Sequence, residues 1–167
     1  VVATASNKVD VGATGITAGL YNLAAQGQKI NIVADKGREQ KGFSSNALVV
    51  ATDLYNSGVR SVKDLKGKKI GITQSGSTFH YTIGRLLEIN GMSLKDVELV
   101  PLGKMGSMMA SLQSKQVDAI VIGEPNVSRI LSEGYGKVIL PVGDAMEYQT
   151  SAVFYSPAFT KDKDLAV

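Results

Sequence analysis

Short apolar segments alternate with helix-like segments along most of the chain, and this order constrains the fold more than any other feature of the sequence. The segment from Thr78 to Asn90 is a predicted helix, because Ile83 and Leu86 lie on one of its faces. Gly91 follows as a C-terminal stop. Strands are predicted at 9–13, 30–34, 69–73, 97–101, 117–122 and 138–142. Strand–helix alternation is typical of mostly parallel sheets flanked by helices, so we expect an α/β fold.

One strand–loop–helix–strand unit occurs twice in the sequence. The two copies align without a net gap, one near the start of the chain and the other about two thirds of the way along it. Any two such units share some pattern, so chance similarity is the alternative explanation. We favour a structural duplication, with two lobes built alike. The aligned pairs are Val9 with Val117, Asp10 with Asp118, Gly15 with Gly123, Leu23 with Leu131, and Lys29 with Lys137.

Two short apolar strands fit neither lobe, and they bracket the second copy of the unit. If the lobes are separate, these strands are the passages between them. We therefore expect hinge strands near 45–51 and 151–155. The first lobe is predicted to combine residues 1–53 with 150–167, and the second to span residues 54–149.

Composition and charge exclude several classes of protein. The 167-residue chain has a net charge of only +3 and lacks the basic stripe of a nucleic-acid-binding protein. It contains no cysteine, which excludes thiol catalysis, cysteine metal sites and disulfides. No apolar run is long enough to span a bilayer, so no direct membrane insertion is expected. The first residues do not resemble a signal peptide, so either the chain is cytoplasmic or a targeting segment has been removed; the fold organisation favours removal.

No catalytic residue, metal site or cofactor is predicted. His80 is the only histidine, and the sequence shows neither a nucleophile to pair with it nor metal-ligand spacing around it. A histidine packed at the surface of a lobe is the more frequent role for such a residue. We therefore expect a binding protein rather than an enzyme.

Three strand-to-helix loops carry the residues suited to binding a ligand, because ligands of open α/β sheets bind beyond the carboxyl ends of the strands. The strongest candidate runs from Gln74 to Phe79, where a helix start offers unpaired N–H groups and a partial positive charge to an anion. Gly76 allows close backbone approach, and neighbouring hydroxyls can donate further hydrogen bonds. Simple N-capping by Ser77 or Thr78 is the alternative.

The other two loops follow the first strand of each copy of the repeated unit. Thr17 is a predicted helix cap in one, and Glu124 is the only charged residue in the three loops. Glu124 is either a solvated carboxylate or an acceptor for an amine or hydroxyl. The candidate ligand-binding residues are Thr14, Gly15, Ile16, Thr17, Gln74, Ser75, Gly76, Ser77, Thr78, Phe79, Gly123 and Glu124.

Motifs at these loops resemble a known family, the substrate-binding proteins of ABC transporters for nitrate, sulfonate and taurine, which also contains binders of thiamine pyrimidine precursors. The likeness covers about residues 8 to 160, in order and in spacing. Its motifs are Val9-Asp10-Val11-Gly12 with Thr14-Gly15, Val62 to Ile70, Gly76-Ser77-Thr78 with His80-Tyr81, and Gln116-Val117-Asp118-Ala119 with Glu124-Pro125.

The resemblance implies a periplasmic-binding-protein-like fold of type II, with two lobes joined by two crossing strands. It implies a small polar or anionic ligand in the interlobe cleft, namely a sulfonate, nitrate, carboxylate or pyrimidine-like compound. It also implies an ABC permease as partner, a monomer when full-length, and a periplasmic protein or a cell-surface lipoprotein anchored through a missing N-terminus. The chain would be a fragment with an incomplete first lobe. The positions that match the family's cleft are Thr14, Gly15, Ser75, Ser77, Thr78 and Glu124.

One residue departs from the family pattern. Members often carry a tryptophan before the Glu-Pro pair, where this chain has Gly123, so a roomier or differently shaped cleft is expected. Two alternatives to a transport receptor stay open: an enzyme on the same frame, and the sensory part of a transcription regulator. Turnover of a bound ligand would indicate the enzyme, and a helix-turn-helix ahead of residue 1 would indicate the regulator.

Overall fold

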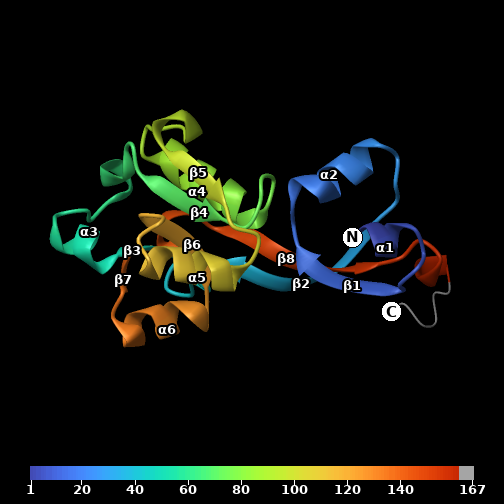
Figure 1. Ribbon diagram of the computed structural model, residues 1–167. Helices are drawn as coiled ribbons and strands as arrows, with labels where there is room; N and C mark the ends of the chain where they lie inside the picture. Colours follow the sequence, from blue (N-terminus) through green and yellow to red (C-terminus); the bar gives the residue numbers. More distant parts are fainter. Residues whose placement is uncertain (162–167) are drawn as a thin grey trace. The chain divides into compact units, whose positions relative to one another are not determined.

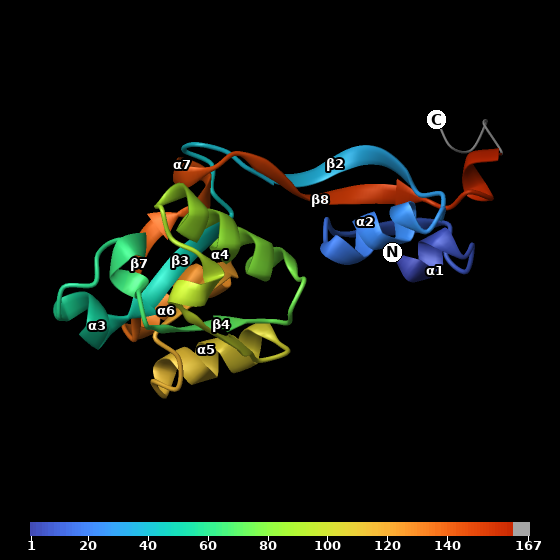
Figure 2. The same cartoon turned by 90° about the horizontal axis from the view of Figure 1, so that it is seen from above.

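The computed structural model describes residues 1–161 and divides the chain into two compact units (Figures 1 and 2). The first unit combines Val1–Arg38 with Tyr148–Val167, and the second is Glu39–Glu147. The chain therefore leaves the first unit once and returns to it once, as the sequence predicts. The crossings lie at 38/39 and 147/148, however, and not at the predicted boundaries near 53 and 150.

The first unit is a three-stranded sheet with short helices. Its strand order is β1-β8-β2, and β1 pairs antiparallel with β8 from Val11↔Tyr155 to Gly15↔Ser151. A small core of Leu20, Ala152 and Phe154 lies at this sheet. Its elements are α1 (Val2–Ala5), β1 (Val11–Gly15), α2 (Ala18–Ala25), β2 (Asn31–Glu39), β8 (Tyr148–Tyr155) and the 3₁₀ turn η3 (Phe159–Lys161).

The second unit is a five-stranded sheet with helices on both faces. Its strand order is β5-β4-β6-β3-β7. Strand β4 is parallel to β5 and β6, whereas β3 is antiparallel to β6 and β7, so four strands point the same way and β3 opposes them. Its elements are β3 (Asn46–Ala51), α3 (Thr52–Asn56), η1 (Val62–Leu65), β4 (Lys69–Ile72), α4 (Thr78–Ile89), η2 (Leu94–Asp96), β5 (Glu98–Pro101), α5 (Met105–Gln113), β6 (Ala119–Gly123), α6 (Asn126–Glu133), β7 (Gly136–Pro141) and α7 (Val142–Ala145).

Strand β3 lies inside this sheet, which corrects the prediction that residues 45–51 are a hinge between lobes. It pairs with β6 on one side and β7 on the other, and all its residues after Asn46 are buried. Val49 packs in the core formed with α5 and α6, while Leu48 and Val50 alternate with it toward the face that α4 covers (Figure 2). A continuous apolar run is what a strand covered on both faces requires. Central strands and hinge strands are both short and apolar, so the run alone does not distinguish them.

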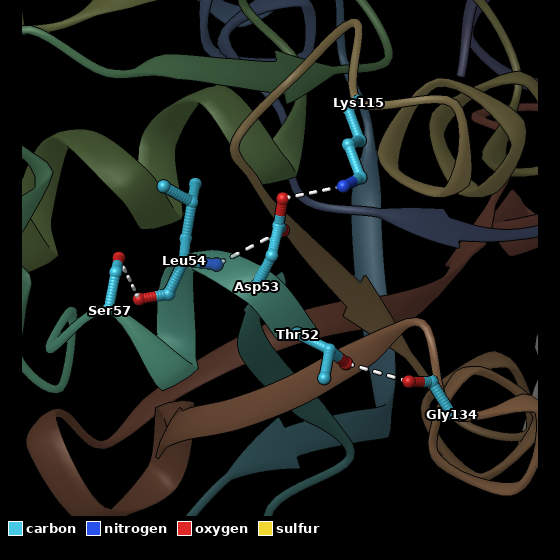
Figure 3. Close-up of polar contacts among 6 residues, drawn as sticks. All are labelled: Thr52, Asp53, Leu54, Ser57, Lys115 and Gly134. Atoms are coloured by element: carbon cyan, nitrogen blue, oxygen red, sulfur yellow. Dashed lines mark hydrogen bonds and ion pairs between the residues drawn. The ribbon is translucent and has the colours of Figure 1, made fainter.

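The two edges of the second unit's sheet differ in chemistry. We name them for the ends of β4, β5 and β6: the amino edge, where these strands begin, and the carboxyl edge, where they end. At the amino edge, Asp53 pairs with Lys115 at 2.7 Å, and Thr52 Oγ1 donates to the carbonyl oxygen of Gly134 at 2.7 Å (Figure 3). The Lys115 ammonium, by its hydrogen bond, lowers the pKa of the Asp53 carboxyl. Polar side chains here therefore satisfy one another.

Two capping boxes complete the amino edge. Ser61 and Asp64 cap η1 reciprocally, and Ser93 and Asp96 do the same for η2. The pKa values of both carboxyls are lowered, chiefly because the Arg60 amide donates a hydrogen bond to Asp64 and the Ser93 amide donates one to Asp96. Each short turn thus carries an aspartate at its third position, and this carboxylate accepts hydrogen bonds from the backbone amides at the start of the turn.

Candidate functional site

The carboxyl edge brings together two of the three loops predicted from the sequence. Because β4 and β6 are parallel neighbours, the loop after Ile72 and the loop after Gly123 lie at the same edge. Helices α4 and α6 begin from these loops, and α5 begins at this edge after β5. Asn126 Nδ2 lies 3.5 Å from the sulfur of Met105 and so links the starts of α6 and α5. Three helix N-termini therefore meet at one edge of the sheet.

The start of α4 is held by Ser77 and His80. Ser77 Oγ accepts a hydrogen bond from the His80 amide at 3.2 Å, which is the capping role that the sequence left as the simpler alternative. His80 Nδ1 accepts from the Gly76 amide at 2.8 Å, so the imidazole closes the turn as a neutral acceptor. Gly76 has φ of 76°, a conformation that glycine adopts without strain. His80 is thus a structural residue of this loop.

Capping leaves hydrogen-bond donors available at the start of α4. Within residues 1–161, neither the Phe79 amide nor the exposed Ser75 hydroxyl donates to any acceptor. The first turn of α4 contains no acidic residue, so nothing in the helix itself offsets its positive end. Gln74 and Gly76 are exposed beside these donors, and Thr78 is half-buried. This arrangement can bind an oxyanion through backbone amides and hydroxyls without an arginine.

Glu124 has a local role that was not expected from the sequence. Its carboxylate oxygens accept hydrogen bonds from the Ser128 amide at 3.1 Å and from Ser128 Oγ at 3.0 Å, which caps the start of α6. Its own amide donates to the Ser45 carbonyl at 2.9 Å, and the bond to Pro125 is cis. The side chain is exposed but locally engaged, so its predicted contact with a ligand stays a prediction.

A buried carboxylate at this edge was missed by the sequence analysis. Glu39 is fully buried, and its oxygens accept hydrogen bonds from Ser44 Oγ at 2.7 Å and from the amide and hydroxyl of Ser45 at 3.2 and 2.6 Å. Asn46 Nδ2 donates to it as well, at 2.6 Å. Ser44 Oγ in turn accepts from the Gly143 amide at 2.7 Å. The run Ser44-Ser45-Asn46 directly before an apolar strand is the signal that could have indicated a polar cluster here.

The third predicted loop belongs to the first unit. Thr14 and Gly15 end β1, and the Ile16 amide donates to the Thr150 carbonyl at 2.9 Å. Thr17 occupies the N-cap position of α2, as predicted, but its side chain makes no capping hydrogen bond. Thr14 to Thr17 are half-buried. That these residues contact a ligand stays a prediction.

The described part of the chain contains neither a cluster of metal-ligating side chains nor a membrane-spanning helix. Over residues 1–161, no three side chains of His, Asp or Glu gather in a way that could hold a metal ion. None of the helices described is both long and apolar enough to cross a bilayer.

Comparison with known proteins places these observations in a family. The model of the family described as NMT1/THI5 like matches residues 3–167. A Haemophilus influenzae protein named "Putative thiamine biosynthesis protein" is 35% identical over 117 residues, which are 70% of this chain and 34% of that protein.

Solved structures give the same picture. The periplasmic aliphatic sulphonate binding protein SsuA from Escherichia coli superposes with a TM-score of 0.81 at 25% identity, covering 97% of this chain and 52% of that one. The alkanesulfonate-binding protein SsuA from Xanthomonas axonopodis pv. citri, bound to MOPS, superposes with a TM-score of 0.75 at 25% identity, covering 95% and 52%. The periplasmic-binding-protein fold is confirmed, and the chain spans between about a third and a half of these relatives.

Proposed function

Because the chain belongs to the NMT1/THI5-like family, we propose that it is part of the solute-binding protein of an ABC importer. Such a protein binds a small ligand outside the cytoplasm and delivers it to a membrane permease. The Escherichia coli structure is named as periplasmic and sulphonate-binding, which supports both the location and the role. The role is that of a receptor, which needs no catalytic residue.

The observation that carries the proposal is the uncompensated start of α4. The Phe79 amide and the Ser75 hydroxyl are donors without an acceptor in residues 1–161, and they stand at the positive end of a helix that has no acid in its first turn. An anionic group bound there accepts these hydrogen bonds and interacts favourably with the helix dipole. The ligand-binding residues that we propose in the second unit are Gln74, Ser75, Gly76, Ser77, Thr78, Phe79, Gly123 and Glu124.

A sulfonate is the ligand class that the relatives favour. Both solved structures carry sulfonate binding in their names, and one of them is bound to MOPS. A sulfonate presents three oxygens around one centre, so it can accept hydrogen bonds from the Phe79 amide and the Ser75 hydroxyl at the same time.

The test is to place a negative charge at the cap of α4 in the full-length protein. Aspartate and asparagine both cap helices well, so Ser77→Asp and Ser77→Asn should keep the fold. We expect Ser77→Asp to weaken binding of short alkanesulfonates at least about 100-fold by calorimetry, because two anions then compete for one set of donors. Ser77→Asn, nearly isosteric and uncharged, should retain much more of the affinity. Equal affinity in the two variants would remove this loop from the site.

A role in thiamine biosynthesis is the second candidate, favoured by the name of the Haemophilus influenzae relative. A pyrimidine-like ligand would replace the sulfonate in that case. Incubation of the full-length protein with pyrimidine precursors, followed by mass spectrometry, separates the possibilities. An unchanged bound pyrimidine indicates a pyrimidine receptor, a converted one indicates an enzyme, and neither result is expected of a sulfonate receptor.

A further inference from the structure

The second unit fastens its entering and leaving chain segments to each other just inside its boundary. The chain enters this unit at 38/39 and leaves it at 147/148. Glu39 is the first residue of the unit, and α7 (Val142–Ala145) is the last helix before the exit. Three contacts join the turn after Glu39 to α7, so the two passages of the chain are linked within this one unit.

The closest of these contacts is between the backbones of Gly143 and Gln40. A Cβ atom added to Gly143 would lie 2.8 Å from the carbonyl carbon of Gln40 and 2.9 Å from its amide nitrogen, with the carbonyl oxygen closer still. Backbone atoms cannot rotate away as a side chain can, so a residue without a side chain is required for α7 to pack this closely. Two hydrogen bonds reinforce the contact, since the Gly143 amide donates to Ser44 Oγ at 2.7 Å and the Gly42 amide donates to Asp144 Oδ1 at 3.3 Å.

Ser44 joins this contact to the buried carboxylate of Glu39. Its hydroxyl oxygen lies 2.7 Å from Glu39 Oε2 and 2.8 Å from the carbonyl oxygen of Asn46, while it accepts the hydrogen bond of the Gly143 amide. A buried carboxylate is stable only when it is hydrogen-bonded, so Glu39 holds the segment before β3 in one conformation. We call Glu39, Gln40, Ser44 and Gly143 the crossing clamp.

The first unit holds the same two passages together on its own side. Strands β2 and β8 are neighbours in its sheet (Figure 2), and Thr150 Oγ1 donates to the carbonyl oxygen of Gly37 at 2.8 Å. Between this pairing and the crossing clamp lie only Arg38 on the outgoing chain and residues 145–148 on the returning chain. A change of direction between two units is absorbed by a few residues at the ends of elements, and these residues occupy that position.

We propose that the crossing clamp makes the two passages act as one joint, with bending confined to Arg38 and residues 145–148. Without the clamp, the turn after Glu39 and helix α7 move separately, and each passage contributes its own freedom. The clamp therefore limits the orientations that one unit adopts relative to the other. A receptor binds its ligand from the fraction of molecules in a competent orientation, so the clamp raises affinity without touching the ligand. That consequence rests on the proposed function, whereas the joint itself does not.

The experiment compares Ser44→Ala with Ser45→Ala in the full-length protein. Each variant removes a hydroxyl that donates to Glu39, but only the Ser44 hydroxyl also accepts a hydrogen bond from α7. The 167 residues contain no cysteine, so spin labels attach at Gln26→Cys in the first unit and Lys95→Cys in the second, with any cysteine elsewhere in the protein replaced by serine. Pulsed electron resonance then measures the distribution of label-to-label distances without ligand. We expect this distribution to be about twice as wide in Ser44→Ala as in the unaltered protein, and unchanged in Ser45→Ala.

Two glycine variants extend the comparison. Gly143→Ala forces the turn away from α7 and should widen the distribution further; the serine pair carries the test if this variant fails to fold. Gly84→Ala, whose added Cβ would meet only the side chain of Leu94 at 3.7 Å or more, is the matched control and should leave the width unchanged. Equal widths in Ser44→Ala and Ser45→Ala, whether narrow or broad, overturn the inference. Because no ligand is present, that result leaves the proposed function standing.

Calorimetry with a short alkanesulfonate tests the consequence for binding. Ser44→Ala should weaken the affinity about threefold, because fewer unliganded molecules have the competent orientation. An unchanged affinity together with a widened distribution overturns the link between the clamp and binding. Failure of the unaltered protein to bind any sulfonate counts instead against the proposed function, and the distance measurement still decides on the joint.

Discussion

The two edges of the second unit's sheet are both rich in small polar residues, yet they use them differently. At the amino edge, Ser61 with Asp64 and Ser93 with Asp96 close two turns, and Asp53 pairs with Lys115. At the carboxyl edge, Ser77 caps α4 in the same way, but the residue three positions later is His80 and not an acid. At the amino edge these acids are paired with amides or with a lysine. At the carboxyl edge the start of α4 keeps donors without an acceptor within residues 1–161.

The difference lies at the third position of each capped turn, which is an aspartate at the amino edge and a histidine at the carboxyl edge. An aspartate at the third position accepts the cap's own amide and neutralises the positive end of the turn. His80 also accepts a hydrogen bond from a backbone amide, that of Gly76. It brings no negative charge, however, so the positive end of the α4 dipole is not offset. Three residues of the carboxyl edge, Ser44, Ser45 and Asn46, donate instead to the single buried Glu39. The Gly143 amide donates in turn to Ser44 Oγ.

The largest expected effect is on stability, from Glu39→Ala. Removing this fully buried carboxylate leaves the donors of Ser44, Ser45 and Asn46 without their acceptor, so we expect the free energy of unfolding to fall by roughly 2–4 kcal/mol. Denaturant unfolding measures the loss. Glu147→Ala, at an exposed acid of the same unit, is the control and should change stability by less than about 0.5 kcal/mol. Similar values for the two variants would show that Glu39 does not organise the carboxyl edge.

The next largest expected effect is on anion affinity. It comes from giving the start of α4 the capping box found at the amino edge. His80→Asp creates the sequence Ser-x-x-Asp seen at Ser61 and Ser93. We expect stability to be kept, because the new acid can cap the helix, and anion affinity to fall about tenfold through charge at the N-terminus. Calorimetry with a short alkanesulfonate measures this loss in the full-length protein.

His80→Asn is the matched neutral variant for that experiment. It also loses the imidazole that accepts from the Gly76 amide, so any cost of disturbing the loop is common to both variants. Only the charge differs between them. If the two variants bind an anion equally well, the contrast between the edges is not electrostatic.

The sequence predicts the strands and helix caps of the two edges better than it predicts which polar side chains pair there. The strands ending at Ile72, Pro101 and Gly123 follow from apolar runs and turn residues, and parallel neighbours place their ends at one edge. The cap at Ser77 follows from residue type and position. These features depend on residues close together in the sequence, so they can be predicted from one amino-acid sequence.

The other features depend on which strands pair with one another, and the local sequence pattern does not specify that. Residues 45–51 read equally well as a hinge or as a central strand, and only the neighbours β6 and β7 decide. The burial of Glu39 and the packing of Asn46 against Gly123 require the register of β3 on β6. The local role of Glu124 also depends on the fold, because its partner Ser128 lies one helical turn away and the pairing requires the start of α6 to be fixed.

The smallest effect tests the amino edge at the exposed pair of Asp53 and Lys115 (Figure 3). Both side chains are more than half exposed, so solvent screens the interaction, and a double-mutant cycle with Asp53→Asn and Lys115→Met should give a coupling below about 1 kcal/mol. The pKa of Asp53 is lowered from 3.8, chiefly by its hydrogen bond with Lys115. The folded state therefore favours the anion, and the coupling is fully present above pH 3.8 and lost as the pH falls through the lowered value. A coupling that persists in strong acid, or that equals the cost of Glu39→Ala, would contradict the view that the amino edge is built from many weak, mutually satisfied contacts.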